Sequence, residues 1–549
     1  MCQQPLTAHL FNGSNFYDNK PALRLVDASA LPADAVVYHS LMFGRVKRSG
    51  KKKLRWCVDP TRTKETTTPE SRAPTVSSST LLVALALLAS NPSWILWQCD
   101  VTGAYTLADP ERKYHIRMPT GWTEYCKMSG LRPPPPGAVA EVLKNLYGSV
   151  DAARVWFNHI VRILTSKFGF HQCPIDRCAF RLAGTSKTGT ATLCLLFLYV
   201  DDIIMVGDRD LCISIQNALR NECPITESTG EYLGMEIHHV AGSGQVRVTQ
   251  TAYAHKVLAN TSMADSKPTK TPLPTDFTAS TQEAPQGGMP KGATELDVPA
   301  VLGSLMYLAV RTRPDLLFSC GILATVCRPN ASCPTAPCPG HRAGLQRCLR
   351  YLRGTTDLGL VFQLQPQGLE LEAWCDASHG REVHHTASGY CKSRSGGFIT
   401  LAGACVSAFS SVQGATALST FEAELYALVH VVRQTLALRL LITFLLGESL
   451  PTTTVHCDNA SVIAQLKRRD LTARSRHIRV HLGFVYDAVD GREISVKFIR
   501  SNRNPANALT AAEDRDRFAR SVDLLTGRPP EGPPLEDDRI VTQLDNIDT

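Results

Sequence analysis

The stretch Leu193-Cys-Leu-Leu-Phe-Leu-Tyr-Val-Asp-Asp-Ile-Ile-Met-Val-Gly207 places two acidic residues between two apolar runs. Short apolar runs bounded by polar residues or glycine are typical of buried strands. We therefore predict a hairpin that carries Asp201 and Asp202 at its tip. Adjacent buried carboxylates repel each other unless a cation compensates them, and Mg²⁺ prefers carboxylate oxygens. The alternative is a turn with two solvated aspartates, which turns favour.

The composition predicts several folded domains that can bind a polyanion. The chain has 549 residues, 44% of them hydrophobic, and carries a net charge of +8; this length is enough for about three or four domains. Charge gathered in patches favours nucleic acid as a partner, and the basic residues cluster at 45–55, 311–313, 342–353 and 467–479. The 18 cysteines have no small-domain framework spacing, so we expect them to be reduced and intracellular.

One apolar region approaches the length of a membrane span. Residues 81–97 are largely apolar, but Ser90-Asn-Pro-Ser93 interrupts them. The remaining pieces are too short to cross a bilayer. We predict a buried helix over 81–89, then a strand over 94–101, and no membrane segment.

A third acidic residue, Asp100, ends that predicted strand and is followed by a turn of small residues and by Tyr105. Taken alone, Asp100 could equally be a helix cap. Two-metal phosphoryl transfer requires carboxylates from different strands to converge on ions about 4 Å apart. Beside the predicted hairpin, Asp100 is therefore a candidate metal ligand.

Further elements follow from the hydrophobic periodicity. In the helix predicted over 152–168, Trp156, Ile160, Leu164 and Phe168 recur every four residues and indicate core packing. The other predicted helices cover 141–147, 211–221, 301–309, 316–326 and 345–353, and a strand pair covers 232–237 and 245–249. Cys327, Cys333, Cys338 and His341 could bind Zn²⁺, but four prolines interrupt their irregular spacing and favour a loop.

A second group of acids lies in the C-terminal half. An alternating strand from residue 369 ends on Asp376. A helix then opens with the capping box Ser419-Thr-Phe-Glu422 and carries Glu424 in its first turns, and a strand over 453–457 ends on Asp458. Each acid alone is unremarkable, but the ordered trio on a β-β-β-α-β-α pattern predicts a metal site.

Taken together, the chain resembles the reverse transcriptase and ribonuclease H portion of copia-type long-terminal-repeat retrotransposon Pol polyproteins over roughly residues 79–510. The motifs that carry the resemblance are Leu198-Tyr-Val-Asp-Asp-Ile-Ile204, Leu146-Tyr-Gly148, Tyr232-Leu-Gly234, Gly303-Ser-Leu-Met-Tyr-Leu-Ala309, Thr312-Arg-Pro-Asp315, Leu349-Arg-Tyr-Leu-Arg-Gly-Thr355, Ala417-Leu-Ser-Thr-Phe-Glu-Ala-Glu424, Cys457-Asp-Asn459 and Arg474-Ser-Arg-His-Ile478.

The resemblance implies an α+β architecture. A right-hand polymerase with fingers and an antiparallel palm sheet would precede a helical connection and a ribonuclease H-like mixed five-stranded sheet flanked by helices. The expected divisions are a poorly matched fingers-like segment (1–78), fingers and palm (79–265), a linker (266–295), the connection (296–365), the ribonuclease H-like domain (366–512) and a mostly disordered tail (513–549).

The resemblance also implies roles for the acids. Asp100, Asp201 and Asp202 would hold two Mg²⁺ or Mn²⁺ ions for DNA synthesis. A second pair of ions would serve RNA hydrolysis, held by Asp376, Glu424, Asp458 and Asn507. Tyr105 would lie under the incoming sugar and exclude a 2′-hydroxyl. Further substrate contacts are implied for Tyr199, Asp151, Arg154, Tyr232 and Gly234, the last two at the primer end.

The expected partners are an RNA template, a DNA primer, an RNA–DNA hybrid and deoxynucleoside triphosphates, with no membrane. The resemblance further suggests association with other retrotransposon proteins in cytoplasmic virus-like particles, with the nucleus as the alternative location. The expected activities are those of an RNA-directed DNA polymerase and a ribonuclease H.

Three departures from the family pattern support an alternative. Asp151 stands where the family usually has a glutamine near the nucleotide, and its carboxylate would repel the triphosphate. Asn507 replaces the fourth ribonuclease H acid, which predicts weaker binding of the second metal ion. The segment before Ser79 matches poorly, and no capsid, protease or integrase region is recognisable. The alternative is a decayed remnant that keeps the fold and at most binds nucleic acid.

Overall fold

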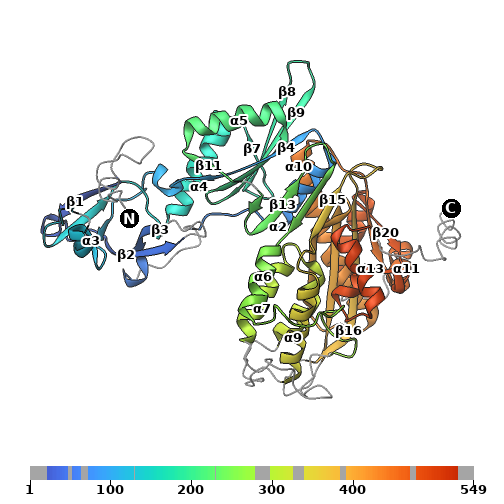
Figure 1. The fold of residues 1–549 in the computed structure, drawn as a ribbon. Coiled ribbons are helices and arrows are strands. Elements are labelled where there is room, and N and C mark those ends of the chain that lie inside the picture. The colour runs from blue at the N-terminus through green and yellow to red at the C-terminus, as the bar shows by residue number, and fades with distance from the viewer. Residues whose placement is uncertain are drawn as a thin grey trace. The chain divides into compact units, whose positions relative to one another are not determined.

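In the computed structural model, the chain divides into two compact units, which are drawn in Figure 1. Unit 1 comprises Met1–Ser77 and Ile95–Thr229, and unit 2 comprises Ser78–Trp94 and Gly230–Thr549. Both units combine sheets with helices, which confirms the predicted α+β class. The structure describes residues 22–46, 52–63, 72–128, 130, 132–228, 230–277, 297–325, 339–383, 391–469 and 478–529.

Unit 1 contains a five-stranded sheet in the order β1-β6-β5-β2-β3. Its apolar face packs around the indoles of Trp56 and Trp122, whose ring centroids are 4.8 Å apart. The short helix α3 (Trp122–Met128) contributes the second of these rings. The strands are β1 (Leu23–Asp27), β2 (Val37–Val46), β3 (Lys52–Asp59), β5 (His115–Arg117) and β6 (Ala138–Val142).

The predicted helix over 141–147 is wrong. Glu141 lies instead on strand β6, which pairs antiparallel with β1 on one side and with β5 on the other. The apolar residues Ala140 and Val142 are buried in this central position. Tertiary pairing on both edges therefore decides the conformation of a segment whose local pattern was ambiguous.

The second sheet of unit 1 has six strands in the order β11-β4-β10-β9-β8-β7. Its central hairpin is formed by β9 and β10, whose apolar side chains are almost all buried. The predicted helices over 152–168 and 211–221 are confirmed as α4 (Ala152–Arg162), which continues into a π-helical turn (Ile163–Lys167), and α5 (Arg209–Glu222). The strands are β4 (Trp94–Val101), β7 (His171–Gln172), β8 (Ala179–Thr185), β9 (Ala191–Tyr199), β10 (Asp202–Asp208) and β11 (Ile225–Glu227).

Unit 2 begins with helix α2 (Ser78–Ser90), which confirms the helix predicted over 81–89 and is buried from Thr80 to Ala89. This helix packs against β14, β15 and β18. A four-stranded sheet has the order β12-β13-β14-β15 and includes the predicted strand pair. Its strands are β12 (Glu231–Tyr232), β13 (Met235–His239), β14 (Gln245–Thr249) and β15 (Leu360–Gln363), and the nearby helices are α6 (Thr251–Asn260), α7 (Val298–Ala309), α8 (Leu317–Ala324) and α9 (Pro339–Gly354).

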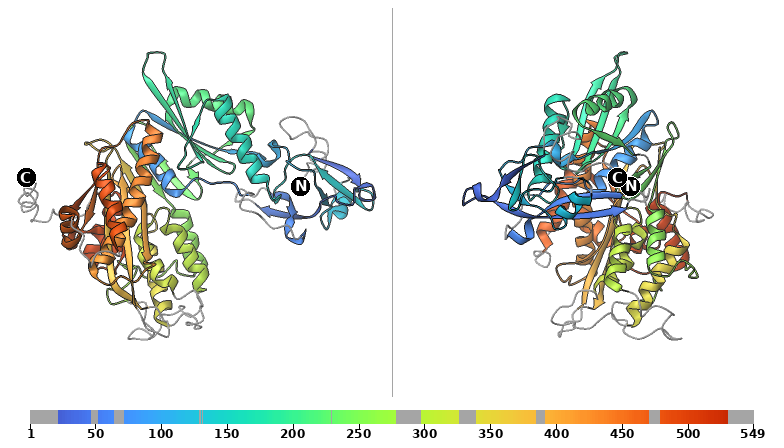
Figure 2. Two further views of the ribbon diagram at one scale, coloured as in Figure 1. Left: turned by 180° about the vertical axis from the view of Figure 1, so that it is seen from behind. Right: turned by 60° about the vertical axis from the view of Figure 1, so that its left-hand side comes forward.

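The last sheet is five-stranded and mixed, in the order β18-β17-β16-β19-β20. The first three strands are antiparallel, whereas β16–β19 and β19–β20 are parallel. The long helix α10 lies along β16 and β17 (Figure 2). The elements are β16 (Leu371–Val383), β17 (Cys391–Leu401), β18 (Ala404–Val412), α10 (Thr420–Leu446), β19 (Thr453–Cys457), α11 (Ala460–Arg468), α12 (Arg479–Asp490), β20 (Ile494–Phe498) and α13 (Arg515–Thr526).

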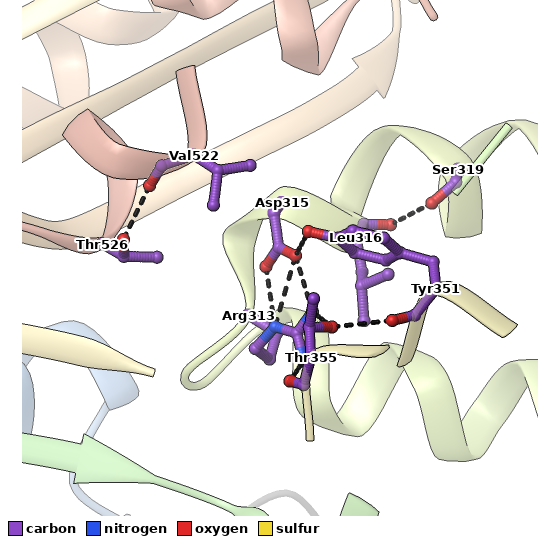
Figure 3. Close-up of polar contacts among 8 residues, drawn as sticks. All are labelled: Arg313, Asp315, Leu316, Ser319, Tyr351, Thr355, Val522 and Thr526. Atoms are coloured by element: carbon purple, nitrogen blue, oxygen red, sulfur yellow. Dashed lines mark hydrogen bonds and ion pairs between the residues drawn. The ribbon is translucent and has the colours of Figure 1, made fainter. Parts of the chain in front are cut away.

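A buried ion pair joins the helices of unit 2 (Figure 3). Arg313 donates from Nη2 to Asp315 Oδ2 at 2.8 Å, and both side chains are almost fully buried. The hydroxyl of Tyr351 on α9 donates to the same carboxylate oxygen at 2.8 Å. Arg313 also donates to the carbonyl oxygen of Thr355 at 2.8 Å. The ring of Tyr351 packs edge-on against Phe518 of α13, with centroids 5.6 Å apart, so this cluster connects α9 to α13.

Among the described residues, α10 is the one helix long and apolar enough to cross a bilayer by length and composition. It packs on the mixed sheet, and the core helices of soluble proteins pass the same test. The cysteines 327, 333 and 338, most of the predicted linker, the motif residues 474–477 and the acidic tail beyond 529 lie outside the described residues. The six-part division of the chain stays a prediction.

Candidate functional site

The predicted acidic hairpin of unit 1 is present. Tyr199 pairs with Asp202 as the last step of the β9–β10 ladder, so Val200 and Asp201 form a two-residue turn. Val200 has a φ of 60°, which is costly for a β-branched residue. The indole Nε1 of Trp156, on α4, donates to the carbonyl oxygen of Val200 at 2.7 Å. This bond holds the strained turn in place.

Strand β4 brings Asp100 to the same turn. The backbone N–H of Val101, the next residue, donates to the carbonyl oxygen of Asp201 at 2.8 Å. Asp100, Asp201 and Asp202 are all half-buried. Burial, together with the charges of Asp201 and Asp100, raises the pKa of Asp202 to about 6. Asp100 and Asp201 are therefore close enough to Asp202 to act on its carboxyl group electrostatically.

Tyr105 also lies near this group. Its ring packs against Tyr147, with centroids 4.8 Å apart. Burial and the charge of Asp201 raise the pKa of the Tyr105 phenol. Tyr105 is carried by a short 3-10 helix (Ala104–Leu107) that directly follows β4. The structure thus brings the predicted sugar-contacting residue close to the acidic hairpin.

Asp151 and Arg154 lie at the start of α4. Asp151 occupies the N-cap position, but its side chain makes no capping hydrogen bond. Arg154 forms a two-pronged ion pair with Glu111, with nitrogen–oxygen distances of 3.1 and 2.7 Å. In this structure the guanidinium of Arg154 is therefore engaged by a protein carboxylate.

Tyr232 and Gly234 belong to unit 2, whereas the acidic hairpin belongs to unit 1. Leu233 and Gly234 have φ angles of 52° and 75° in the tight turn between β12 and β13, a backbone shape typical of a type I′ turn. The Tyr307 hydroxyl and the Arg311 guanidinium both donate to the Leu233 carbonyl oxygen, at 2.9 and 3.0 Å. Tyr232 itself is 3% exposed, so in this structure its side chain packs in the core.

The second acidic group lies on the mixed sheet of unit 2. Asp376 comes from β16, Glu424 from α10 and Asp458 from the residue after β19. Their ligand atoms lie within 4.8 Å of one another, and in the part of the chain that the structure describes no other group of three or more such side chains is this tight. The capping box holds α10, since the N–H of Glu422 donates to the Ser419 hydroxyl at 3.2 Å.

Burial dominates the electrostatics of this trio. Asp376 and Glu424 are each 7% exposed. Burial, with the charge of Asp458, raises the pKa of Asp376 to about 7. Burial, with the charge of Asp376, raises the pKa of Glu424 to about 10. Such a group is poorly stabilised when ionised, because buried like charges repel.

One atom of the trio points to a missing positive partner. Oε1 of Glu424 accepts from the N–H of Ala377 at 3.3 Å, whereas its Oε2 is buried and has no hydrogen-bond partner. A buried carboxylate oxygen without a partner is costly. Three converging carboxylates with an unused oxygen fit a divalent cation, which takes oxygen ligands. Asp376, Glu424 and Asp458 would hold it.

The trio opens into a cavity of about 620 Å³. Asn507 lines this cavity, and its Nδ2 donates to the Ser501 carbonyl oxygen at 2.6 Å. The side chain of Thr510 donates to Asp376. This approach is possible because Gly396 faces Asp376 on β17, where a Cβ atom would lie 2.6 Å from the Thr510 methyl group.

Several cavity residues were missed by the sequence analysis. Glu513, Asp514, Arg517 and His379 also line the cavity, and Trp156 was interpreted only as a packing residue. For Glu513, Asp514 and Arg517 the sequence offers only a charged stretch, in which no acid differs from its neighbours by pattern. Burial distinguishes Glu513 from its neighbours, and burial is set by tertiary packing.

Comparisons of this chain with a family model and with individual proteins agree with one another. A model described as reverse transcriptase (RNA-dependent DNA polymerase) matches residues 50–275. A Pol polyprotein from transposon TNT 1-94 of Nicotiana tabacum is 28% identical over 459 residues, which cover 82% of this chain and 32% of that protein. The Pol polyprotein from transposon RE2 of Arabidopsis thaliana is 25% identical over 466 residues, which cover 83% of this chain and 29% of that protein.

Among solved structures, a foamy viral protease–reverse transcriptase in complex with an RNA/DNA hybrid aligns with 11% identity and a TM-score of 0.42, covering 87% of this chain and 51% of that one. The chain spans about a third of the length of the two transposon polyproteins that it matches.

Proposed function

Because the chain belongs to the Pol polyproteins of copia-type retrotransposons, we propose that it is an RNA-directed DNA polymerase that also has ribonuclease H activity. The substrates would be deoxynucleoside triphosphates and a primed RNA template for the first activity, and an RNA–DNA hybrid for the second. The cytoplasm is the proposed location, and Mg²⁺ or Mn²⁺ the proposed cofactor.

The polymerase proposal is carried by the junction of β4 with the β9–β10 hairpin. The bond from the Val101 N–H to the Asp201 carbonyl oxygen brings carboxylates from two strands together. Divalent cations bound there would lower the pKa of the primer hydroxyl and neutralise the leaving phosphate. The chain would use Asp100, Asp201 and Asp202 to hold them, and Trp156 to fix the turn that presents the last two. Tyr105 would lie beside the sugar.

The ribonuclease H proposal is carried by the trio of Asp376, Glu424 and Asp458 within 4.8 Å. The cavity of about 620 Å³ in front of the trio would admit the scissile phosphate. Discrimination of RNA from DNA would require contact with the 2′-hydroxyl. Thr510 would orient Asp376 through its hydrogen bond.

Primer extension on an RNA template with Mg²⁺ tests the first activity. The full chain is compared with the double variant Asp201→Asn/Asp202→Asn. A matched control is Asp208→Asn, which removes one carboxylate from the far end of β10, where Asp208 accepts from the Leu193 N–H at 2.6 Å. We expect extension by the parent and the control and none by the double variant.

Release of labelled RNA from a hybrid tests the second activity. Asp376→Asn should abolish release, whereas Asp487→Asn, an exposed acid on α12, should not. If a folded parent binds hybrid but neither extends primers nor cuts RNA, the chain is a non-catalytic remnant, and Asp151 is the first residue to revert.

A further inference from the structure

The cavity in front of the ribonuclease H-like trio has a strongly negative lining. Five acidic residues and one arginine line it: Asp376, Glu424, Asp458, Glu513, Asp514 and Arg517. Three of these acids form the tight trio. Glu424 is 7% exposed and its Oε2 has no hydrogen-bond partner, which marks the cavity as a cation site independently of the count of acids.

Glu513 differs from the other two acids of its segment. It is 8% exposed, whereas Asp514 and Asp516 are exposed. Asp514 caps α13, since it accepts from the backbone N–H groups of Asp516 and Arg517 at 3.1 and 3.0 Å. Glu513 makes no such cap, so the structure gives its carboxylate another environment, inside the cavity wall.

Two contacts fix the carboxylate of Glu513. The Ser521 hydroxyl, eight residues further along the chain on α13, donates to its Oε2 at 2.9 Å. Arg517 Nε forms an ion pair with its Oε1 at 3.7 Å, a distance that is too long for a hydrogen bond. Helix α13 is itself anchored by Phe518 against Tyr351, the residue that completes the buried ion pair of Figure 3.

Glu513 lines the same cavity as Asp376 and the other two acids of the trio. Its negative charge adds to the effect of Asp458 in raising the pKa of Asp376. Asn507, the residue in the same cavity that the family resemblance assigns to the second ion, is neutral, and its amide nitrogen is used by Ser501. The cavity wall therefore contains a buried acid, Glu513, from a different position in the sequence than Asn507.

We infer that Glu513 supplies the carboxylate that Asn507 lacks, so that Glu513 and Asp376 together hold the second of two divalent cations in this cavity. The inference rests on the proposed ribonuclease H function, because it names a ligand of that same site.

Calorimetric titration with Mn²⁺ alone tests the inference on the full chain at pH 8. The Asp201→Asn/Asp202→Asn background removes binding at the polymerase hairpin, so that only the cavity contributes. We expect two ions in this background. Adding Glu513→Gln should weaken one of them by about tenfold or more, since the loss of even outer-shell partners of metal ligands has effects of this size.

The matched control is Asp514→Asn, which removes the same charge from the adjacent cavity residue and keeps an oxygen that can cap α13. It should leave both ions bound. Adding Asn507→Asp to Glu513→Gln should restore the second ion. Thermal unfolding without metal checks that each variant is folded; Glu513→Asp, which keeps the charge and shortens the side chain, replaces Glu513→Gln if the latter does not fold and should weaken the same ion.

The inference is overturned if Glu513→Gln binds two ions as tightly as its parent, if Asp514→Asn weakens them equally, or if the parent binds a single ion. Hybrid cleavage separates this result from the proposed function. Two ions that depend on Glu513, without any RNA cleavage, would refute the ribonuclease H proposal and leave the metal site standing. Cleavage that Glu513→Gln leaves unchanged, with two ions still bound, would refute only the role of Glu513.

Discussion

The two acidic groups of the molecule each bring three carboxylates together, but they differ in how far these carboxylates are buried. On the hairpin of unit 1, the three aspartates are half-buried, and the pKa of Asp202 rises only to about 6. On the mixed sheet of unit 2, Asp376 and Glu424 are each 7% exposed, and their pKa values rise to about 7 and about 10. The carboxylates of the first group are partly exposed to solvent, whereas two of the three in the second group are buried.

The difference concerns what each site needs before a cation arrives. Half-buried carboxylates can stay ionised with help from water, so the hairpin can accept a cation without first releasing protons. Enclosed carboxylates hold protons at neutral pH, and a cation must displace them, as metal ligands generally require. We therefore expect metal binding to be more strongly coupled to pH and to stability in unit 2.

The largest expected effect comes from removing one acid from each site. Asp202→Asn should lower primer extension at least about 100-fold and spare RNA cleavage, and Asp376→Asn should do the reverse, because changes to mere outer-shell metal partners already cost about 10–100-fold. Steady-state rates of both reactions, measured on each variant, check this. Loss of both activities in either variant would contradict two separate sites.

The second prediction compares the sites through pH. A carboxyl whose pKa is raised on folding keeps a proton that the unfolded chain releases, so stability falls as pH rises from its ordinary to its raised pKa. Between pH 6.5 and 8.5, Glu424 lies inside this window throughout, Asp376 leaves it near pH 7, and Asp202 is already past it. One titrating carboxyl lowers the free energy of unfolding by about 1.4 kcal/mol per pH unit, and each kcal/mol lowers the unfolding temperature by about 2–4 °C. Without metal, the unfolding temperature should therefore fall by roughly 5–10 °C over this range.

Thermal unfolding by circular dichroism at the two pH values, with and without Mg²⁺, measures this. Mg²⁺ should recover stability mainly at pH 8.5, and Glu424→Gln should remove most of the pH dependence and leave the smaller part that Asp376 contributes below pH 7. The same pH dependence in Glu424→Gln as in the parent would show that the enclosed trio is not its source.

A smaller effect is expected at the support of the hairpin. Trp156→Phe removes the indole N–H that holds the Val200 carbonyl and keeps most of the packing. The loss of one hydrogen bond, about 0.5–1.5 kcal/mol, should slow primer extension roughly two- to tenfold and leave RNA cleavage unchanged. Trp97→Phe, on β4, is the matched control, since its indole contacts Glu227 at 3.3 Å. Equal losses in both variants would indicate general damage to the sheet.

The smallest effect is expected at Asp151. Replacing it with asparagine removes a charge near the nucleotide, and no capping bond is lost. The KM for deoxynucleoside triphosphates should fall by roughly two- to fivefold, the size of a surface charge interaction of about 0.2–1 kcal/mol. Glu124→Gln, an exposed acid on α3, should leave KM unchanged. An unchanged KM in Asp151→Asn would remove the electrostatic argument for impaired activity.

The sequence predicted the acids next to apolar or alternating runs because the pattern there is local. The predicted strand end at Asp376 is wrong, since β16 continues to Val383. Asp202 follows the turn after an apolar run, and Asp376 lies on an alternating strand, so composition and periodicity were enough. The conformation of residues 141–147 was not local, since pairing with β1 and β5 overrode it. Glu513 shares its segment with two other acids, Asp514 and Asp516, and only the tertiary packing of the segment distinguishes it by burial. The φ of 60° at Val200 has no signal in sequence, because β-branched residues usually avoid it.

The buried pair of Arg313 and Asp315 has an evolutionary consequence. Removing one partner of such a pair costs about 3–5 kcal/mol, whereas replacing both by apolar residues is often neutral. The two positions are therefore epistatic, and a lineage that changes either one alone must cross a fitness valley. Asp151 and Asn507, which are only partly buried, face no such barrier. If mutations accumulate without selection for activity, residues of the two proposed active sites would therefore change earlier than the buried pair that holds the fold.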